Sequence, residues 1–300
     1  MNIKTDQRLR ITLRQLEVFA ATVRAGSTRA AAGRVARSQS AASNALAELE
    51  ATLGHTLFDR IGRRLVLNEN GQALLPHTIS LLEQAVEVEA LLNAEHQAPL
   101  RMASSFTIGE YLLPGLIAQW KLQRPQAQVR LDIANTREVL EAVATFDVDL
   151  GFIEGTGSHP DLLVRRWRPD ELVAVAAAGH TFGRRGASAK QLAQATWILR
   201  ERGSGTREVS DRWLTTHLGR APVGLELGSN EAVKRAVAAG LGIGFLSRHA
   251  VTDAVQQGWL VELKTPFPPM RRMLAVVVHR SRRLGSVAQG FLQHCLASTG

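Results

Sequence analysis

Residues 28–44, Thr-Arg-Ala-Ala-Ala-Gly-Arg-Val-Ala-Arg-Ser-Gln-Ser-Ala-Ala-Ser-Asn, predict two short helices joined by a tight turn. The first of these helices is rich in alanine, so it can approach another helix or a sugar-phosphate backbone closely. The second begins at Ser38 and carries small hydroxyl and amide side chains, which can hydrogen-bond base edges in a major groove. The stretch favours DNA binding, and the alternative is an alanine-rich helical hairpin that has no partner.

The residues around this stretch indicate where its helices begin and end. Apolar side chains at helical spacing precede Gly26, a suitable C-terminal stop, and Ser27 or Thr28 can cap the following helix. Ser38 is the expected N-cap of the third helix, whose apolar residues pack inward until Gly54 ends it. The segment therefore predicts three consecutive helices.

Residues 60–67 predict a small hairpin that is rich in arginine. Three helices followed by a basic hairpin make a winged helix-turn-helix, which we expect over residues 11–68. In that arrangement the third helix reads the base sequence, while the arginines of the wing hold phosphates and set the register. The expected DNA-binding residues are Thr28, Arg29, Ser38, Gln39, Ser40, Ser43, Asn44, Arg60, Arg63 and Arg64.

The basic residues are concentrated in the same part of the chain. The net charge is +9 and the isoelectric point is near 10.8. Up to residue 68, eleven basic residues outnumber five acidic ones, so a charge of +6 lies in less than a quarter of the 300 residues. This placement favours a polyanionic partner. A membrane surface would also attract positive charge, but the segment lacks the large apolar face that interfacial helices bury. We therefore expect double-stranded DNA as the partner and no membrane.

Length and composition predict an ordinary globular protein. A chain with 45% hydrophobic and 21% charged residues suggests about two domains. Cys295 is the only cysteine, which excludes an intramolecular disulfide and favours a reducing compartment. The N-terminus lacks the apolar core of a signal peptide, and no run approaches the roughly 18 apolar residues that span a bilayer. These features predict a cytoplasmic protein.

A long helix follows the expected hairpin. Asn68 can cap it, it runs to about Glu95, and residues 69–97 form a linker. Pro76 is expected to kink it early. Its apolar stripe alternates by four and three, as in the seam of two paired helices, and consists of Leu74, Thr78, Leu81, Ala85, Val88 and Leu92. The same stripe could pack on its own domain, but a two-fold DNA site demands a dimer, so we favour pairing.

From Leu100 onward, short apolar runs alternate with amphipathic stretches. This alternation predicts parallel α/β sheets, and there are more strands than one compact half needs. We therefore expect two lobes with a cleft over residues 98–300, with lobe I at about 98–165 and 270–300 and lobe II at about 166–269. The candidate strands are Leu100–Ala103, Val129–Ile133, Leu150–Ile153, Leu172–Ala176, Trp197–Leu199, Gly224–Leu227, Ile243–Leu246 and Leu274–His279.

Polar side chains directly follow several of these strands. Ligands of open parallel sheets bind beyond the carboxyl ends of strands, where helix N-termini present free N–H groups. The sharpest of these positions is residues 202–207, in which two glycines allow close approach and Arg207 could hold an oxyanion with two hydrogen bonds. The expected ligand-binding residues are Ser104, Ser105, Thr107, Asn135, Thr136, Ser204, Gly205, Thr206, Arg207 and Asn230. Simple helix capping is the alternative role for the hydroxyl and amide side chains.

The pattern does not predict catalysis. Position 202 is arginine, so no nucleophile elbow surrounds Ser204, and the histidines lack metal-ligand spacing. We therefore expect no catalytic residue, metal or cofactor, only a small anionic ligand. An enzyme or solute-binding protein with an incidental helical N-terminus is the rival class. A late cluster of basic residues, which we interpret as a solvated face, consists of Arg271, Arg272, Arg280, Arg282 and Arg283.

Over essentially its full length, the chain resembles LysR-type transcriptional regulators. The N-terminal resemblance lies in Leu16-Glu17-Val18-Phe19, Gly26-Ser27, Ala31-Ala32, Ser38-Gln39-Ser40-Ala41-Ala42-Ser43, Leu49-Glu50, Leu53-Gly54, Leu57-Phe58-Asp59-Arg60 and Asn68-Glu69-Asn70-Gly71. Further segments resemble the branch that contains regulators of carbon fixation and of sulfite or sulfur metabolism: residues 107–114, 135–139, 149–155 and 197–207.

The resemblance implies a dimer or tetramer that pairs through its linker helices and has a periplasmic-binding-protein-like effector domain. It also implies an operator with an interrupted dyad, RNA polymerase as a candidate partner, and a small co-inducer between the lobes. The chain departs from the family at four positions. Ser40 replaces a usual proline, Arg37 a usual apolar residue and Phe106 a common hydroxyl. Asn44 stands where arginine is frequent, and because an amide favours adenine, the operator should differ.

Overall fold

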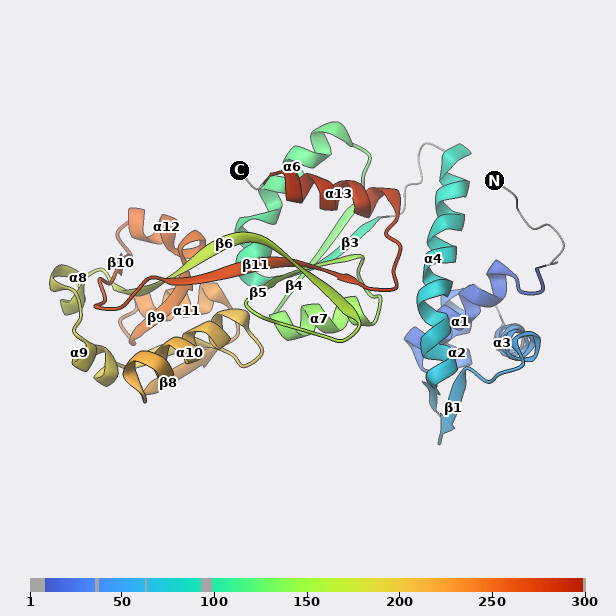
Figure 1. Ribbon diagram of the computed structural model, residues 1–300, viewed down its shortest axis with the longest axis horizontal. Coiled ribbons are helices and arrows are strands. Elements are labelled where there is room, and N and C mark those ends of the chain that lie inside the picture. The colour runs from blue at the N-terminus through green and yellow to red at the C-terminus, as the bar shows by residue number, and fades with distance from the viewer. Residues whose placement is uncertain (1–8, 36–37, 63, 93–98, 299–300) are drawn as a thin grey trace. The chain divides into compact units, whose positions relative to one another are not determined.

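The computed structural model describes residues 9–35, 38–62, 64–92 and 99–298 (Figure 1). The chain divides into two compact units, one formed by Met1–Ala98 with Ser281–Gly285 and the other by Pro99–Arg280 with Ser286–Gly300. Among the described residues, no helix is both long and apolar enough to cross a membrane.

The first unit begins with three helices, and short polar and glycine residues set their ends. Ser27 and Ser38 cap the second and third helices, because their hydroxyls accept hydrogen bonds from backbone N–H groups three residues later. Gly26 and Gly54 end the first and third helices in the left-handed conformation, with φ of 65° and 74°. The predicted ends are confirmed. The helices are α1 (Leu13–Ala25), α2 (Thr28–Arg34) and α3 (Gln39–Leu53).

A two-stranded hairpin follows these helices, as the sequence predicts. Its antiparallel strands are β1 (Phe58–Ile61) and β2 (Arg64–Leu67). Phe58 begins the hairpin in the core, where its ring meets that of Phe19 edge to face at 5.6 Å. Alanines of α2 and the inward face of α3 complete this core, through Ala31, Ala32, Ala42, Leu46 and Leu49.

The long helix α4 (Glu69–Leu92) begins where Asn68 accepts a hydrogen bond from the N–H of Gly71 at 3.0 Å. The helix continues through Pro76 without interruption. Leu81 and Val88 remain 45% and 62% exposed. The predicted last turn, up to Glu95, lies outside the described residues.

The second unit contains one nine-stranded mixed sheet in the order β4-β3-β5-β11-β6-β9-β7-β8, with β10 paired to β6. The predicted parallel pairing is found within two groups, β3-β4-β5 and β7-β8-β9, while two long strands, β6 and β11, run antiparallel to each other and connect these groups. The strands are β3 (Leu100–Ser105), β4 (Val129–Ala134), β5 (Leu150–Glu154), β6 (Leu162–Ala177), β7 (Trp197–Arg200), β8 (Val223–Leu227), β9 (Ile243–Ser247), β10 (Leu260–Glu262) and β11 (Met270–His279).

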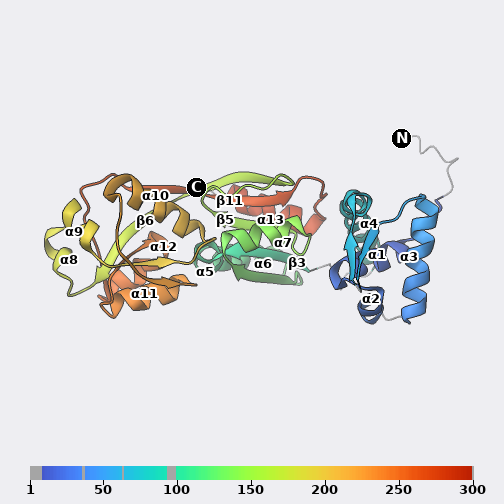
Figure 2. The same cartoon turned by 90° about the horizontal axis from the view of Figure 1, so that it is seen from below.

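Helices cover both faces of this sheet. On the β3-β4-β5 side, Figure 1 shows α6 and α13 over one face and α7 over the other. On the β7-β9 side, Figure 2 shows α10 over one face and α11 with α12 over the other. The helices are α5 (Phe106–Tyr111), α6 (Leu113–Gln123), α7 (Thr136–Ala144), α8 (Thr181–Arg185), α9 (Ala189–Gln194), α10 (Gly205–Leu218), α11 (Asn230–Ala238), α12 (Arg248–Gln256) and α13 (Ser286–Ala297).

Apolar cores on both faces of the sheet hold these layers together. Trp197 stacks on Phe245 at 4.5 Å beneath α10, and Val233 and Val237 of α11 pack on the opposite face of the same strands. Val139 of α7 belongs to a separate core on β3 and β5. The sheet thus places the carboxyl ends of β3, β4, β5 and β7 where loops of both strand groups can meet.

Candidate DNA-binding surface and ligand site

The N-terminal half of α3 presents a polar face to solvent. Ala42, Leu46 and Leu49 are buried, which fixes the rotation of the helix about its axis. Ser38 caps the helix, and its hydroxyl lies 3.1 Å from that of Ser40. The predicted base-reading residues Gln39, Ser43 and Asn44 are exposed, and so are Ser38, which was predicted to cap the helix and contact the DNA backbone, and Ser40.

Exposed arginines lie on other elements of the same unit. Arg29 on α2, Arg60 on β1 and Arg64 on β2 are exposed, and within the described residues none of them forms a salt bridge. Thr28, the first residue of α2, is half-buried. Arg63 lies outside the described residues. The described cations are therefore available to an external anion such as a phosphate group.

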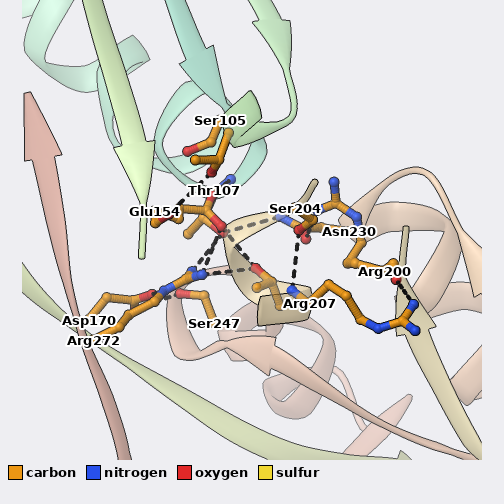
Figure 3. Close-up of polar contacts among 12 residues, drawn as sticks. Ser105, Thr107, Glu154, Asp170, Arg200, Ser204, Arg207, Asn230, Ser247 and Arg272 are labelled. Carbon is orange, nitrogen blue, oxygen red and sulfur yellow. Dashed lines mark hydrogen bonds and ion pairs between the residues drawn. The ribbon is translucent and has the colours of Figure 1, made fainter. Parts of the chain in front are cut away.

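In the second unit, a buried carboxylate joins the loops after three strands. Glu154, at the end of β5, is 1% exposed. Its Oε1 accepts a hydrogen bond from the N–H of Thr107 at 2.7 Å, and its Oε2 accepts one from the hydroxyl of Thr206 at 2.8 Å. Its backbone carbonyl accepts a hydrogen bond from the hydroxyl of Thr136 at 3.2 Å. Predicted ligand residues from the loops after β3, β4 and β7 therefore meet at Glu154 (Figure 3).

Arg272 on β11 completes this polar cluster. Its Nη1 donates to Glu154 at 2.8 Å, and its Nε donates to Asp170 of β6 at 2.7 Å. Its Nη1 and Nη2 also donate to the hydroxyls of Thr206 at 2.9 Å and Thr107 at 3.2 Å. Figure 3 shows Arg272 between the two carboxylates. The interpretation of Arg272 as part of a solvated face is wrong, because this residue is only 6% exposed; Arg282, at 8%, is also buried.

Two other predicted residues have the capping role that was the alternative. Asn135 and Glu138 form a capping box at the start of α7, and the side chain of Asn135 accepts from the N–H of Glu138 at 3.0 Å. Ser204 caps α10. These two helix starts lie together, because the N–H of Arg137 donates to the carbonyl of Gly203 at 3.2 Å.

The remaining predicted residues are buried beside the cluster. Asn230 donates to the hydroxyl of Thr107 at 3.3 Å. The hydroxyl of Ser104 donates to the carbonyl of Ser105 at 3.1 Å. The hydroxyl of Ser105 is buried and has no hydrogen-bond partner in the described structure. It is thus a polar group in the cluster that a ligand could still satisfy.

Arg207, the expected oxyanion ligand, contacts other residues of its own domain in this structure. Its Nε donates to both oxygens of Asp211 at 2.8 Å, and its Nη1 donates to Glu226 at 2.6 Å and to the carbonyl of Arg200 at 2.7 Å. In Figure 3 its guanidinium extends away from Glu154 and Arg272. In this structure Arg207 joins α10 to β7 and β8 and is paired with two half-exposed carboxylates, so its role in ligand binding stays a prediction.

Sequence reasoning did not identify Glu154, Asp170 and Arg272 as site residues. It also missed Arg200, which donates to Asn230 at 2.7 Å, and Ser247, whose hydroxyl donates to Asp170 at 2.7 Å. The other site residues were predicted because they are polar and lie at the carboxyl ends of strands. Glu154 and Arg200 are the last residues of β5 and β7, so the same rule could have found them. Asp170 and Arg272 lie inside β6 and β11 and face each other only because these two long strands pair. The sequence alone does not show this pairing. Within the described part of the chain, no group of three potential ligands is placed to hold a metal ion.

Because Glu154 is paired, we expect the stability of the protein to depend on acid pH. Burial by itself raises the pKa of this carboxyl, but Arg272 and the hydrogen bonds from Thr206 and Thr107 outweigh burial and hold the pKa below its usual value. The stabilisation is complete above the ordinary glutamate pKa of about 4.3 and is lost as the pH falls through the lower pKa of the folded state. Between about pH 7 and about pH 3, the free energy of unfolding measured with urea should fall less for Glu154→Gln than for the unmodified protein. Parallel pH profiles would contradict this assignment.

Comparisons with known proteins agree with both parts of the chain. Residues 13–72 match the family described as "Bacterial regulatory helix-turn-helix protein, lysR family", and residues 93–300 match "LysR substrate binding domain". The regulator YeiE of Escherichia coli (strain K12) is 46% identical over 96% of this chain and 98% of its own length. The RuBisCO operon transcriptional regulator of Allochromatium vinosum is 30% identical over 96% of this chain and 97% of its own length.

Solved structures show the same fold. A full-length OxyR variant from Pseudomonas aeruginosa is 23% identical, with a TM-score of 0.73 over 97% of this chain and 99% of that one. The regulatory domain of CcmR from Synechocystis PCC6803, in complex with 2-PG, is 29% identical, with a TM-score of 0.63 over 68% of this chain and 98% of that one. The relatives are regulators rather than enzymes, and carbon-fixation and sulfur-metabolism regulators are among them. The chain therefore belongs to the LysR family of DNA-binding transcriptional regulators, with a helix-turn-helix domain and a two-lobed effector-binding domain.

Proposed function

We propose that α3 reads the operator through Gln39, Ser43 and Asn44, while Arg29, Arg60 and Arg64 hold phosphates. The observation that carries this proposal is the exposure of a polar face on α3 whose opposite face is fixed in the core. Amide and hydroxyl groups recognise base edges, whereas arginines on phosphates position the protein without reading sequence. Ser38, Ser40 and Thr28 contribute contacts near the backbone, and Arg63 belongs to the proposed wing.

Two substitutions separate base reading from phosphate binding. Asn44→Ala should relax sequence preference and cost about 1–3 kcal/mol at one base position. Arg64→Ala should weaken binding evenly across sequences and flatten its salt dependence, because it removes one phosphate contact. Competition gel shifts with operator variants at several salt concentrations measure both effects. If the two variants behaved alike, the assigned roles would be wrong.

The proposed domains are the winged helix-turn-helix at 11–68, the linker at 69–97 and the effector domain at 98–300. Within the effector domain, lobe I comprises about 98–165 and 270–300, and lobe II comprises about 166–269. A gel shift with genomic fragments compares the full chain with a truncation that begins at Leu100. Binding by the full chain alone supports a DNA-binding N-terminal domain. Equal behaviour of the two proteins would favour the rival, a solute-binding or enzymatic protein with an incidental helical N-terminus.

We place the effector at the polar cluster around Glu154 and propose a small anion as co-inducer. Hydroxyls from three loops and two buried arginines, Arg200 and Arg272, support this assignment, together with the ligand-bound relative. Thermal-shift screening of sulfite, sulfate, phosphate, 2-phosphoglycolate and small carboxylates tests it. A ligand that also changes operator binding would identify the co-inducer. If DNA binding instead depends neither on the DNA sequence nor on any metabolite tested, a structural nucleoid protein is favoured.

Self-association through α4 is the proposed basis for recognising an interrupted dyad. Leu81 and Val88 are exposed on one stripe of α4 in the single chain, although they are large and apolar. We propose a cytoplasmic dimer or tetramer, with RNA polymerase as a further partner. Sedimentation of Leu81→Glu/Val88→Glu, which places charges on the stripe, should show dissociation if α4 pairs.

A further inference from the structure

Arg200 differs from the other buried arginines of the effector domain in its partners. The residue is 2% exposed, at the end of β7. Its Nε and Nη2 bind the two oxygens of Glu201 at 2.8 and 2.9 Å, while Nη1 donates to Asn230 at 2.7 Å. The ring of Phe106 covers its guanidinium at 4.4 Å. The amide and the ring are neutral, so the carboxylate that pairs with Arg200 comes from the next residue in the chain.

Glu201 is the more accessible member of this pair. Its side chain is 22% exposed, whereas that of Arg200 is 1% exposed. Glu201 can therefore turn towards water and leave only the guanidinium of Arg200 as a buried charge, whereas the partners of Arg272, Glu154 and Asp170, are themselves 1% and 4% exposed. Arg200 would then need another anion, since an unpaired buried guanidinium is costly.

The surroundings of Arg200 connect it to the polar cluster. Asn230, which accepts from Arg200, donates to the hydroxyl of Thr107. Phe106, which covers Arg200, follows Ser105, whose buried hydroxyl has no partner in the described structure. Figure 3 shows Arg200 directed towards Asn230, whereas Arg207 extends in the other direction. An anion on Arg200 would thus lie beside the uncharged groups of Asn230 and Ser105, and near the carboxyl of Glu110, whose charge also interacts with Arg200.

We propose that Arg200 is the anion-binding residue of the effector site and that Glu201 is an internal counter-ion which the effector replaces. This inference rests on the proposed function of the cluster. The ligand class is a small carboxylate, phosphate or sulfur oxyanion, because two terminal oxygens reproduce the bidentate geometry of Glu201 on Arg200. Phe106 restricts access to the guanidinium, so the effector must pass or displace its ring.

The test measures two effects of one substitution, the change in anion affinity and the change in melting temperature, because ligand competition and a purely structural ion pair predict different combinations of them. Glu201→Gln removes the competing charge, so it should tighten the binding of 2-phosphoglycolate or inorganic phosphate about tenfold while lowering the melting temperature of the unliganded protein. A purely structural pair would lower stability without tightening binding. Titration calorimetry and thermal shift on the full chain measure the two quantities.

The matched control is Glu262→Gln. Glu262 also binds an arginine through both oxygens, here Nη1 and Nη2 of Arg248 at 2.9 and 3.0 Å, outside the cluster, so its loss should leave anion affinity unchanged. Arg200→Gln should weaken binding about 10- to 100-fold, and Arg200→Lys, which keeps the charge, should weaken it less.

The outcomes distinguish this inference from the proposed function. If the unmodified protein binds an anion but Glu201→Gln does not tighten binding, or tightens it no more than Glu262→Gln, then Arg200 is not the anion site and the effector lies elsewhere in the domain. If neither the unmodified protein nor Glu201→Gln binds any of the probe anions, both the inference and the anionic co-inducer are wrong. Tightening by Glu201→Gln alone supports the inference.

Discussion

Replacing Arg272 with methionine should lower the free energy of unfolding by about 3–5 kcal/mol, the largest effect we expect from a single substitution. The change leaves Glu154 and Asp170, at 1% and 4% exposed, without their cation. It also removes the donors to Thr206 and Thr107. A buried charge that loses its partner retains the cost of its desolvation, so the penalty exceeds the value of the intact pair.

Arg271 provides the matched control, because it precedes Arg272 on the same strand and is exposed. Arg271→Met should change the free energy of unfolding by no more than about 0.5 kcal/mol. Urea unfolding of the full chain at neutral pH measures both variants. Adding Glu154→Gln to Arg272→Met should recover part of the loss, because one uncompensated charge disappears. Equal destabilisation by Arg271→Met and Arg272→Met would contradict the assigned role of the network.

Replacing Gly205 with alanine should destabilise the effector domain by about 3 kcal/mol and abolish its ligand response. Gly205 is the first residue of α10, where alanine would otherwise be a good helix former. A Cβ there would lie 2.1 Å from the carbonyl oxygen of Glu154 and 2.6 Å from its carbonyl carbon. Backbone atoms cannot rotate away, so α10 must separate from β5 and carry Thr206 out of the cluster.

The control is Gly115→Ala, near the start of α6. A Cβ at Gly115 meets no atom within 4 Å, so this variant should be neutral or more stable by up to about 1 kcal/mol. Circular dichroism during urea unfolding compares the two glycines, and thermal shift with an anion reports the ligand response. A Gly205→Ala protein as stable as Gly115→Ala would show that the contact with Glu154 is not tight.

Much of the N-terminal unit was predictable because local residues determine it. Ser27 and Ser38 cap their helices, and Gly26 and Gly54 end theirs, through contacts within a few residues along the chain. Such signals survive in a single sequence. Inner strands of the nine-stranded sheet, such as β5, were also evident, since a run of apolar residues marks a strand that is buried on both faces.

The rest depended on contacts between distant residues. The first half of β6 was missed because it is charged and contains Pro169, so no apolar alternation marks it as a strand. Its pairing with β11 supplies that information instead. The partners of Arg207 also depended on distant residues: its position after a strand predicted a ligand, whereas in this structure it pairs with Glu226 on another strand. A sequence shows where a cation lies and not which carboxylate meets it.

The two strands that run through both lobes determine how the effector domain can respond to its ligand. β6 and β11 stay hydrogen-bonded to each other from Leu162 to Leu172, with one irregularity between Leu274 and Ala275. A flexible loop between the lobes would let them open widely. The paired strands β6 and β11 instead form a ribbon that bends and twists elastically. The response to the ligand should therefore be a small rotation about this ribbon, which returns to its starting angle when the ligand leaves.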